Sequence, residues 1–246
     1  MTAAYWAERA ATLLDRVRVA RPQVHVLTST VAQNLTANML LALGADVRAS
    51  LAPGEVDVFA AQADALLVNL GMFDETRSEA IARALPVIEQ RQAPWVLDPV
   101  HVEAGSPRAA LASSLFARGP SIVRANEDEY ATLSSWSKPT GHLPVLVRSG
   151  EIDVITGVRD QVRLAGGDPL MARVTAAGCA GTAVLAALLP VAETPFEAAV
   201  AGMLILGVAG ELAGERATGP ASFQMHWLDA VYALDRVQLG ERARLA

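Results

Sequence analysis

Short runs of apolar, mostly β-branched residues alternate with helical patterns along the chain, and this alternation constrains the fold more than any other feature. Strands that are buried on both faces read as continuous apolar runs, and a helix after each strand covers one face of a parallel sheet. The sequence therefore predicts an α/β fold, a three-layer sandwich whose mostly parallel sheet carries helices on both faces.

The expected elements follow one another from residue 5 to residue 239. Strands are predicted at 24–29, 65–70, 95–98, 121–124, 145–148, 153–156 and 161–164, and helices at 5–18, 31–43, 55–63, 75–92, 107–117, 127–135, 178–190, 195–215 and 226–239. The last three strands are joined too tightly for parallel crossovers, which favours antiparallel pairing at one edge. No repeat or linker divides the chain, so residues 1–246 are expected to form a single domain.

The composition excludes several classes of site. Lys138 is the one lysine and lies in Ser-Lys-Pro-Thr, so the sequence lacks the Gly-rich lysine loop of a P-loop enzyme. The one cysteine, Cys179, excludes a multi-cysteine zinc site and a disulfide framework. A net charge of −6 argues against a nucleic-acid surface. The apolar stretches 176–192 and 198–210 are shorter or more interrupted than a membrane span of about 20 residues. We expect a cytoplasmic protein with no membrane or nucleic-acid partner.

Polar residues stand at the ends of most of the apolar strands. They are Thr28, Ser29, Asn69, Asp98, Arg124, Asn126, Ser149, Gly150 and Glu151. Ligands of open parallel sheets bind at the carboxyl ends of the strands, although a polar residue can also simply mark where a strand leaves the core. A site is favoured for Asp98, and for Arg124 with Asn126, because a charge at the end of a buried strand is costly unless it is paired or used.

Small residues open the long apolar helix predicted at 178–190. A helix N-terminus offers free N–H groups and a positive dipole to an anion, and the same field lowers the pKa of a thiol. Cys179 is therefore expected to be a partly ionised thiol beside an anion site. The alternative is an ordinary buried cysteine, since cysteine is among the most buried residue types.

Three further side chains leave alternatives open. His25 lies inside a predicted strand and is expected in the core, whereas His101, after Asp98-Pro99-Val100, is a candidate to line the site. Glu129 is either a solvated acid in the first turn of a helix or a carboxylate that reaches bound magnesium through water.

A series of segments matches one known family in its order. They read His-Val-Leu-Thr at 25–28, Asn-Leu-Thr-Ala-Asn at 34–38, Leu-Leu-Ala-Leu-Gly-Ala at 40–45, Ala-Leu-Leu-Val-Asn-Leu-Gly at 65–71, Val-Leu-Asp-Pro-Val at 96–100, Ile-Val-Arg-Ala-Asn with Glu129 at 122–129, Ser-Gly-Glu-Ile-Asp at 149–153, and Gly-Pro-Ala-Ser-Phe with Leu-Asp-Ala-Val-Tyr at 219–232. Over roughly residues 10–235 they resemble the signatures of the hydroxyethylthiazole kinase family.

The resemblance implies a ribokinase-like kinase that transfers the γ-phosphate of ATP to the hydroxyethyl group of 4-methyl-5-(2-hydroxyethyl)thiazole in thiamin salvage. It also implies Mg²⁺ as a cofactor, assembly as a homotrimer and Cys179 as the catalytic residue. The remaining implied roles are ATP binding by Arg124, Asn126, Ser149 and Gly178, substrate binding by Ser29, Ala49 and Ala176, and metal binding by Asp98 and Glu129.

The sequence departs from the family pattern in the ligand-binding segments. The family's Gly-Thr-Gly-Cys reads Ala-Ala-Gly-Cys at 176–179, its Asn is Ser29, its substrate-facing Met is Ala49, and the segment 127–143 is short. These departures keep two alternatives open: a ribokinase-like kinase for another small alcohol, or a catalytically weak homologue that binds thiazole or nucleotide. Because a thiol is a poor base, slow turnover is expected.

Overall fold

The computed structural model describes residues 1–133, 136, 139 and 142–246. Within this part of the chain a nine-stranded sheet runs in the order β2-β1-β3-β4-β5-β6-β7-β8-β9. The strands are β1 (Gln23–Leu27), β2 (Asp46–Arg48), β3 (Ala65–Asn69), β4 (Trp95–Asp98), β5 (Ile122–Asn126), β6 (Val145–Ser149), β7 (Ile152–Thr156), β8 (Gln161–Ala165) and β9 (Arg244–Leu245). Pairing is parallel from β2 to β6 and antiparallel from β6 to β9. The predicted α/β fold and its antiparallel edge are confirmed.

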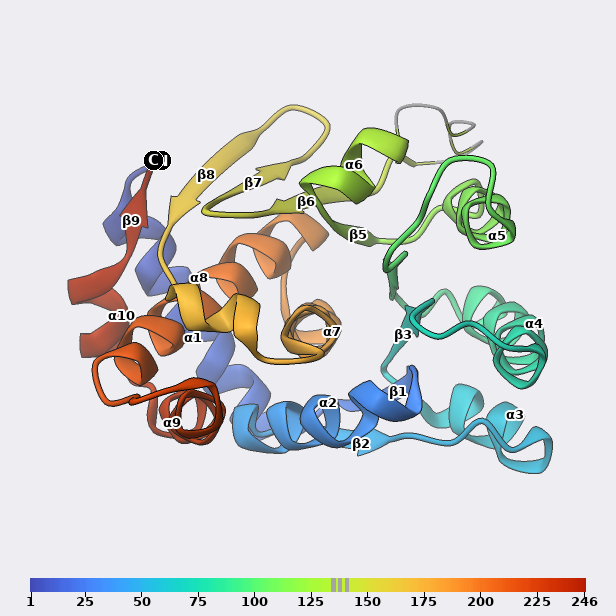
Figure 1. Ribbon diagram of the computed structural model, residues 1–246, viewed down its shortest axis with the longest axis horizontal. Coiled ribbons are helices and arrows are strands. Elements are labelled where there is room, and N and C mark those ends of the chain that lie inside the picture. The colour runs from blue at the N-terminus through green and yellow to red at the C-terminus, as the bar shows by residue number, and fades with distance from the viewer. Residues whose placement is uncertain (134–135, 137–138, 140–141) are drawn as a thin grey trace.

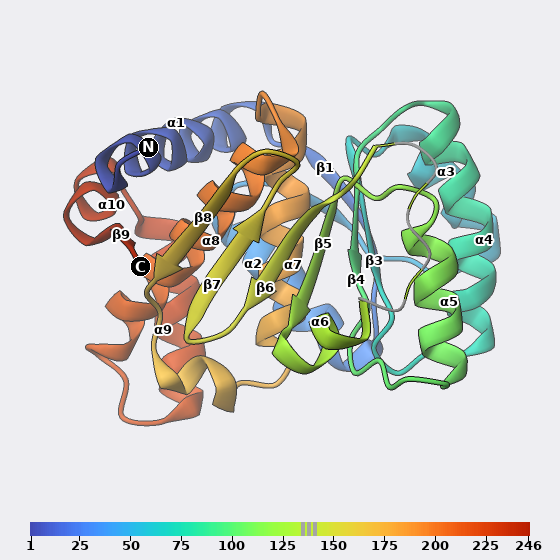
Figure 2. The ribbon, with the colours of Figure 1, turned by 90° about the horizontal axis from the view of Figure 1, so that it is seen from above.

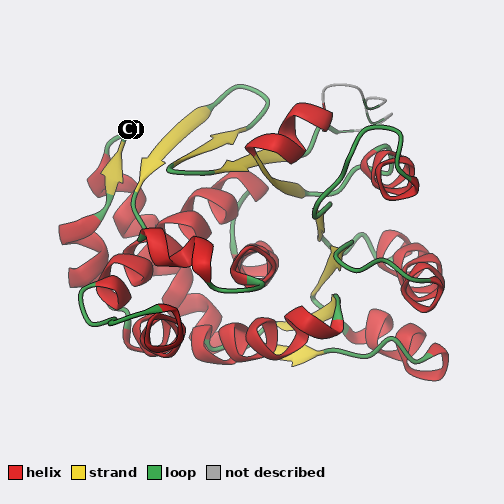
Figure 3. Cartoon of the chain, viewed as in Figure 1, coloured by secondary structure: helices red, strands yellow, loops and turns green. Residues whose placement is uncertain are grey.

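Helices cover both faces of the sheet (Figures 1 and 2). One layer holds α3 (Pro53–Gln62), α4 (Glu75–Gln90) and α5 (Pro107–Phe116), and the other side holds α1 (Ala3–Ala20), α2 (Thr30–Leu43), α7 (Ala177–Leu188), α8 (Pro195–Gly214), α9 (Pro220–Ala233) and α10 (Arg236–Arg242). The short α6 (Glu127–Leu133) follows β5, and two 3₁₀ turns, η1 (Pro169–Arg173) and η2 (Leu189–Val191), flank α7. Figure 3 shows the same arrangement by type of element.

Strand β3 is apolar from Ala65 to Val68 because its two faces supply different cores. On β3, Ala65 and Leu67 belong to the cluster beneath α7 and α8, while Leu66 and Val68 belong to the cluster beneath α4 and α5. All four are 0% exposed. Full burial of a leucine side chain stabilises a fold by about 1.5–3 kcal/mol, so such doubly buried strands fix the sheet between its two layers.

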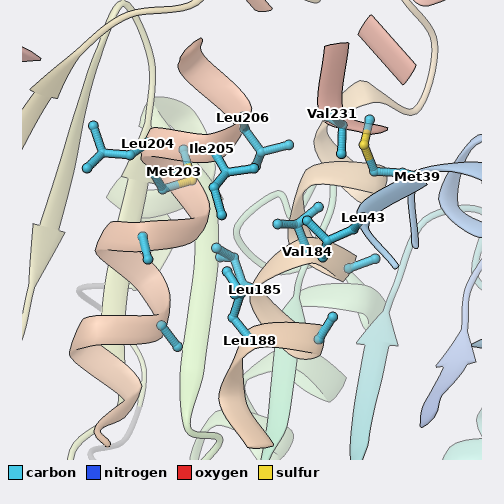
Figure 4. Packing of buried hydrophobic residues seen from close by; sticks show 14 of the residues in the cluster. Met39, Leu43, Val184, Leu185, Leu188, Met203, Leu204, Ile205, Leu206 and Val231 are labelled. Carbon is cyan, nitrogen blue, oxygen red and sulfur yellow. The ribbon is translucent and has the colours of Figure 1, made fainter. Parts of the chain in front are cut away.

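Helices α7 and α8 form the centre of the larger core. α7 packs against β1, β3, β4, α2 and α8, and every residue from Ala180 to Leu188 is buried. By length and composition α8 resembles a membrane span, but 78% of its most apolar 18-residue window is buried inside the fold, as in a core helix. Figure 4 shows Leu185 and Leu188 of α7 between the two helices.

Several expected elements differ from the observed ones. The single helix expected at 226–239 is wrong: α9 ends at Ala233 and α10 begins after Asp235, whose carboxylate accepts from Gln238 N in a capping box. The short edge strands β2 and β9 were not expected. Lys138, expected in a loop, and the last two residues of the helix expected at 127–135 lie outside the described residues.

The contact between α7 and α8 depends on Gly202. A Cβ at this position would overlap Leu185 and lie 3.1 Å from Cδ1 of Leu188. We expect G202A to lower the free energy of unfolding by about 1–3 kcal/mol, measured by denaturant titration. The matched control is G240A on α10, where nothing lies within 4 Å of the added Cβ. Equal stability of G202A and the wild type would contradict the packing.

Candidate active site

Four polar residues end neighbouring strands at the same edge of the sheet. Asn69 lies opposite Asp98 in the β3–β4 register, and Asn126 lies opposite Ser149 in the β5–β6 register. Each is the last residue of its strand, whereas the sequence placed such residues just past the strands. Arg124 lies inside β5, two residues before the edge. The expectation that these side chains converge on the carboxyl edge is met for this set.

The first turn of α7 is tied to this edge by side chains of β4 and β5. Oδ2 of Asp98 accepts hydrogen bonds from Asn69 Nδ2 at 2.8 Å and from the Thr182 hydroxyl at 2.9 Å. Nη1 of Arg124 donates to the carbonyl oxygen of Gly178 at 3.0 Å. A Cβ at Gly178 would lie 3.1 Å from Nη1, so the missing side chain lets the guanidinium lie against the helix.

The backbone N–H groups at the start of α7 have no side-chain cap. Ala176 stands at the N-cap position, and no side chain accepts a hydrogen bond there. Its φ of 65° lies in the left-handed region, which is uncommon for residues other than glycine. Ala177 N donates to the carbonyl oxygen of Val174 at 3.2 Å. The next amides of a helix start, those of Gly178 and Cys179, have no intrahelical acceptor and are the donors that this turn offers to an anion.

Burial and neighbouring charges perturb two carboxyl groups near Arg124. Burial raises the pKa of Asp98 to about 6, Arg124 acts against this rise, and the charge of Glu129 adds to it. Burial also raises the pKa of Asp153 to about 6, opposed by the hydrogen bond from Gly150 N and by Arg124. Neither Asp153 nor Thr182 was expected at the site, because the sequence pattern shows neither burial nor contact.

The expectation that Cys179 is partly ionised is wrong. Burial, followed by the negative charge of Asp98, raises the pKa of its thiol to about 12. A hydrogen bond with the Asn69 side chain and the charge of Arg124 act in the opposite direction but do not prevail. Loss of water therefore outweighs the favourable field of a helix N-terminus, and the thiol is protonated at neutral pH.

Glu129 is buried, with 7% of its surface exposed, so its interpretation as a solvated helix-start acid is wrong. Its carboxylate accepts hydrogen bonds from His101 N at 2.7 Å and from Asn126 N at 2.9 Å. Asn126 Oδ1 in turn accepts from Glu129 N at 2.9 Å. These bonds fix the carboxylate between the end of β5 and the loop after β4.

The donor set suits a magnesium ion that keeps most of its water. Among the described residues no group of three or more His, Cys, Asp or Glu side chains forms a metal cluster. Magnesium commonly binds one or two carboxylates together with waters and substrate phosphates. Both side-chain hydrogen bonds of Asp98 go to Oδ2, which leaves Oδ1, and the repulsion between Asp98 and Glu129 is the kind a cation relieves.

Of the three residues expected to bind the substrate, two lie at the carboxyl edge of the sheet and one lies away from it. Ser29 caps α2, and its Oγ would lie 3.8 Å from a Cβ added at Gly71, beside the ends of β3 and β4. Ala176 begins α7 at the same edge. Ala49 is exposed and follows β2, two strands away from β3.

The two histidines lie in different surroundings. His25 is 0% exposed in β1, with Nε2 at 3.3 Å from the carbonyl oxygen of Ser50, so its prediction as a core residue is confirmed. His101 is exposed and has a φ of 51°. It lines a cavity of about 390 Å³ with Phe73, Glu103, Ser106, Pro107 and Arg108. His101 thus stands at the rim of the carboxyl edge.

Comparisons with solved structures identify the class. A ribokinase-like protein from Enterococcus faecalis has the same fold at a TM-score of 0.62 and 14% identity, covering 92% of this chain and 95% of that one. The hydroxyethylthiazole kinase of Pyrococcus horikoshii superimposes with a TM-score of 0.89 and 26% identity, covering 97% of this chain and 98% of that one. The chain therefore shares the fold of ribokinase-like proteins.

Sequence comparisons identify the family. The model of the hydroxyethylthiazole kinase family matches residues 14–141 and 140–237. The hydroxyethylthiazole kinase of Granulibacter bethesdensis is 40% identical over 99% of this chain and 97% of its own length. The chain belongs to the hydroxyethylthiazole kinase family, and the resemblance found in the sequence is confirmed.

The left-handed conformation of Ala176 leads to a stability prediction. Alanine in this conformation costs about 1 kcal/mol relative to glycine. We expect A176G to raise the free energy of unfolding by about 0.5–1 kcal/mol in thermal or denaturant unfolding, because the strain disappears. The control is the neighbouring A177G, inside the helix, which is expected to lower stability by about 1 kcal/mol. A loss of stability in A176G would contradict the strain.

The raised pKa of Asp153 leads to a prediction of pH dependence. The folded protein holds this proton more tightly than the unfolded chain, so ionisation of Asp153 opposes folding, with no effect below pH 4 and the full effect above pH 6. D153N retains an oxygen for the bond from Gly150 N. Its unfolding free energy is expected to rise relative to the wild type between pH 4 and pH 6. The exposed D160N is the charge control, and a pH-independent difference for D153N would contradict the prediction.

Proposed function

We propose that the chain transfers the γ-phosphate of ATP to the hydroxyethyl group of 4-methyl-5-(2-hydroxyethyl)thiazole, acting as a single kinase domain in thiamin salvage. The observation that carries this proposal is the start of α7, where open amide donors, the Arg124 guanidinium and the Asp98 carboxylate meet. The hydroxyethylthiazole kinase relatives match nearly the full chain, which supports the same reaction.

The phosphate groups of ATP are proposed to bind where positive potential is concentrated. The amides in the first turn of α7 and the guanidinium of Arg124 face developing negative charge, and such preorganised donors stabilise a transferring phosphoryl group. Arg124 already contacts Gly178, so the two act on the same phosphate region. Asn126 and Ser149, paired at the ends of β5 and β6, are proposed to bind the rest of the nucleotide.

Asp98 and Glu129 are proposed to be the residues that would hold Mg²⁺. When bound, the ion neutralises charge on the phosphate oxygens. The protein's own contribution is to orient the carboxylates: Asn69 and Thr182 fix Asp98, and the backbone amides of His101 and Asn126 fix Glu129.

Cys179 is proposed to orient the substrate hydroxyl rather than to remove its proton, because its raised pKa keeps the thiol protonated. The hydroxyl oxygen forms a bond to the γ-phosphorus while the bond to the leaving oxygen of ADP breaks. The hydroxyl proton passes to the phosphoryl oxygens or to solvent. Phosphoryl transfer depends mainly on positioning and electrostatic stabilisation, so a strong base is not required.

The identity of the alcohol is proposed to depend on Ser29 and Ala176 at the carboxyl edge and on Ala49 after β2. The exposed alanine at position 49 leaves more room than the methionine found in the family, which favours an additional or larger alcohol as the second candidate substrate. Homotrimer assembly and a cytoplasmic location are proposed on the family resemblance alone, and analytical ultracentrifugation tests the assembly.

A coupled ATP-consumption assay with hydroxyethylthiazole and a panel of small alcohols tests the proposed reaction. We expect turnover with the thiazole alcohol and a decrease in kcat of about 3- to 30-fold in C179A, which loses one orienting contact. C179D, which restores a polar group, is expected to match or exceed the wild-type kcat.

Three outcomes would contradict parts of this proposal. Unchanged phosphorylation by C179A would exclude a role for the thiol. Turnover confined to another alcohol would identify a different kinase. Thiazole binding in calorimetry without any turnover would identify a catalytically weak homologue.

A further inference from the structure

The amide of Asn69 is held in one orientation at the end of β3. It is 0% exposed, and its Oδ1 accepts a hydrogen bond from Gly71 N at 3.1 Å. A backbone N–H can only donate, so the oxygen of the amide must face Gly71 and the NH₂ group must face the other way. That NH₂ group donates to Oδ2 of Asp98 at 2.8 Å.

The Asn69 side chain also acts on the neighbouring Cys179, since it lowers the pKa of that thiol against the larger effect of burial. An amide NH₂ carries two hydrogens, so the bond to Asp98 uses only one of them. Asn69 therefore holds the carboxylate at the end of β4 that Thr182 of α7 also contacts.

The turn that holds Asn69 is braced from behind by a buried arginine. Arg77, on α4, is 1% exposed and donates through Nη1 to the carbonyl oxygen of Gly71 and through Nη2 to that of Met72. Met72 has a φ of 47°, in the left-handed region that side chains disfavour. Asp74, the ionic partner of Arg77, is largely exposed and lies 3.5 Å away.

A buried guanidinium is expensive unless its hydrogen bonds are used. Burial lowers the pKa of Arg77, and its Nε has no partner. Both terminal nitrogens of the guanidinium donate hydrogen bonds to carbonyl groups of one turn. Gly71 N, in the same turn, donates the hydrogen bond that orients the Asn69 side chain. Arg77 therefore acts on Asn69 through this turn.

We propose that Asn69 is a positioning residue that fixes the Asp98 carboxylate beside the start of α7, and that Arg77 positions Asn69 by holding the turn at 70–72. This inference rests on the proposed function in one respect: it matters for catalysis only if Asp98 and Cys179 serve phosphoryl transfer. The contacts themselves concern the free protein and are testable without ATP.

The first test uses the fact that Cys179 is the one cysteine in the chain. Iodoacetamide therefore reports on this thiol alone, in the protein without nucleotide or alcohol. N69D keeps the size of the side chain but replaces a donor with an acceptor and adds negative charge. We expect its alkylation at pH 9 to be at least about threefold slower than in the wild type, because the thiolate is the reactive form.

The second test separates positioning from a merely structural role. In the kinase assay N69D is expected to lower kcat at least about tenfold while the KM for ATP changes less than about threefold. R77K and R77M are also expected to lower kcat and the rate of alkylation, by smaller factors than N69D. The matched controls are R83K and R83M on the same helix, where Arg83 pairs with Asp57 at the surface; they are expected to leave both unchanged.

Circular dichroism establishes that each variant is folded, and R77K serves where R77M does not fold. Alkylation and kcat within twofold of the wild type in folded N69D would overturn the role of Asn69. Wild-type values in folded R77K and R77M would overturn the role of Arg77. Slower alkylation of N69D, in a chain whose wild type phosphorylates no alcohol, supports the positioning contacts while the proposed function fails.

Discussion

The arrangement of the site depends on the attachment of the start of α7 to the carboxyl edge of the sheet. Thr182 reaches Asp98 of β4, and Arg124 of β5 reaches Gly178, so two strands hold one helical turn. The rest of α7 is buried among β1, β3, β4, α2 and α8. Core packing therefore determines where the open amides of the helix stand relative to the carboxylates.

The sequence predicted those parts of the fold that hydrophobic pattern controls. Strands such as β3 are apolar on both faces, so their position and parallel order follow from the alternation with helices. The edge residues Asn69, Asp98, Asn126 and Ser149 follow in turn, because a polar residue after such a run marks the end of a strand. The break between α9 and α10 was missed because Asp235 acts as a helix cap, which competes with a continuous helical pattern.

The protonation of Cys179 was not predictable, because it depends on a balance of opposing effects. Position at a helix N-terminus favours the thiolate, while loss of water and the charge of Asp98 favour the thiol, and the second pair prevails. Burial and the distance to a carboxylate on another strand are tertiary quantities that the segment around residue 179 does not contain. The role of Arg77 was missed for the same reason, since an arginine in a helical pattern is expected at the surface.

The charged side chains at the carboxyl edge of the sheet favour ligand binding more than they favour the stability of the free protein. Asp98 and Glu129 repel each other, and Arg124 offsets only part of the desolvation that raises the pKa of Asp98. A fold selected for stability alone would place neutral residues there, because buried charges are costly even when paired. The carboxylates are instead held rigidly by amides and hydroxyls, with Asn69 fixing Asp98 and backbone N–H groups fixing Glu129. Such preorganisation is expected where polar phosphates and their counter-ion bind, since the protein then meets the electrostatic cost before the reaction begins.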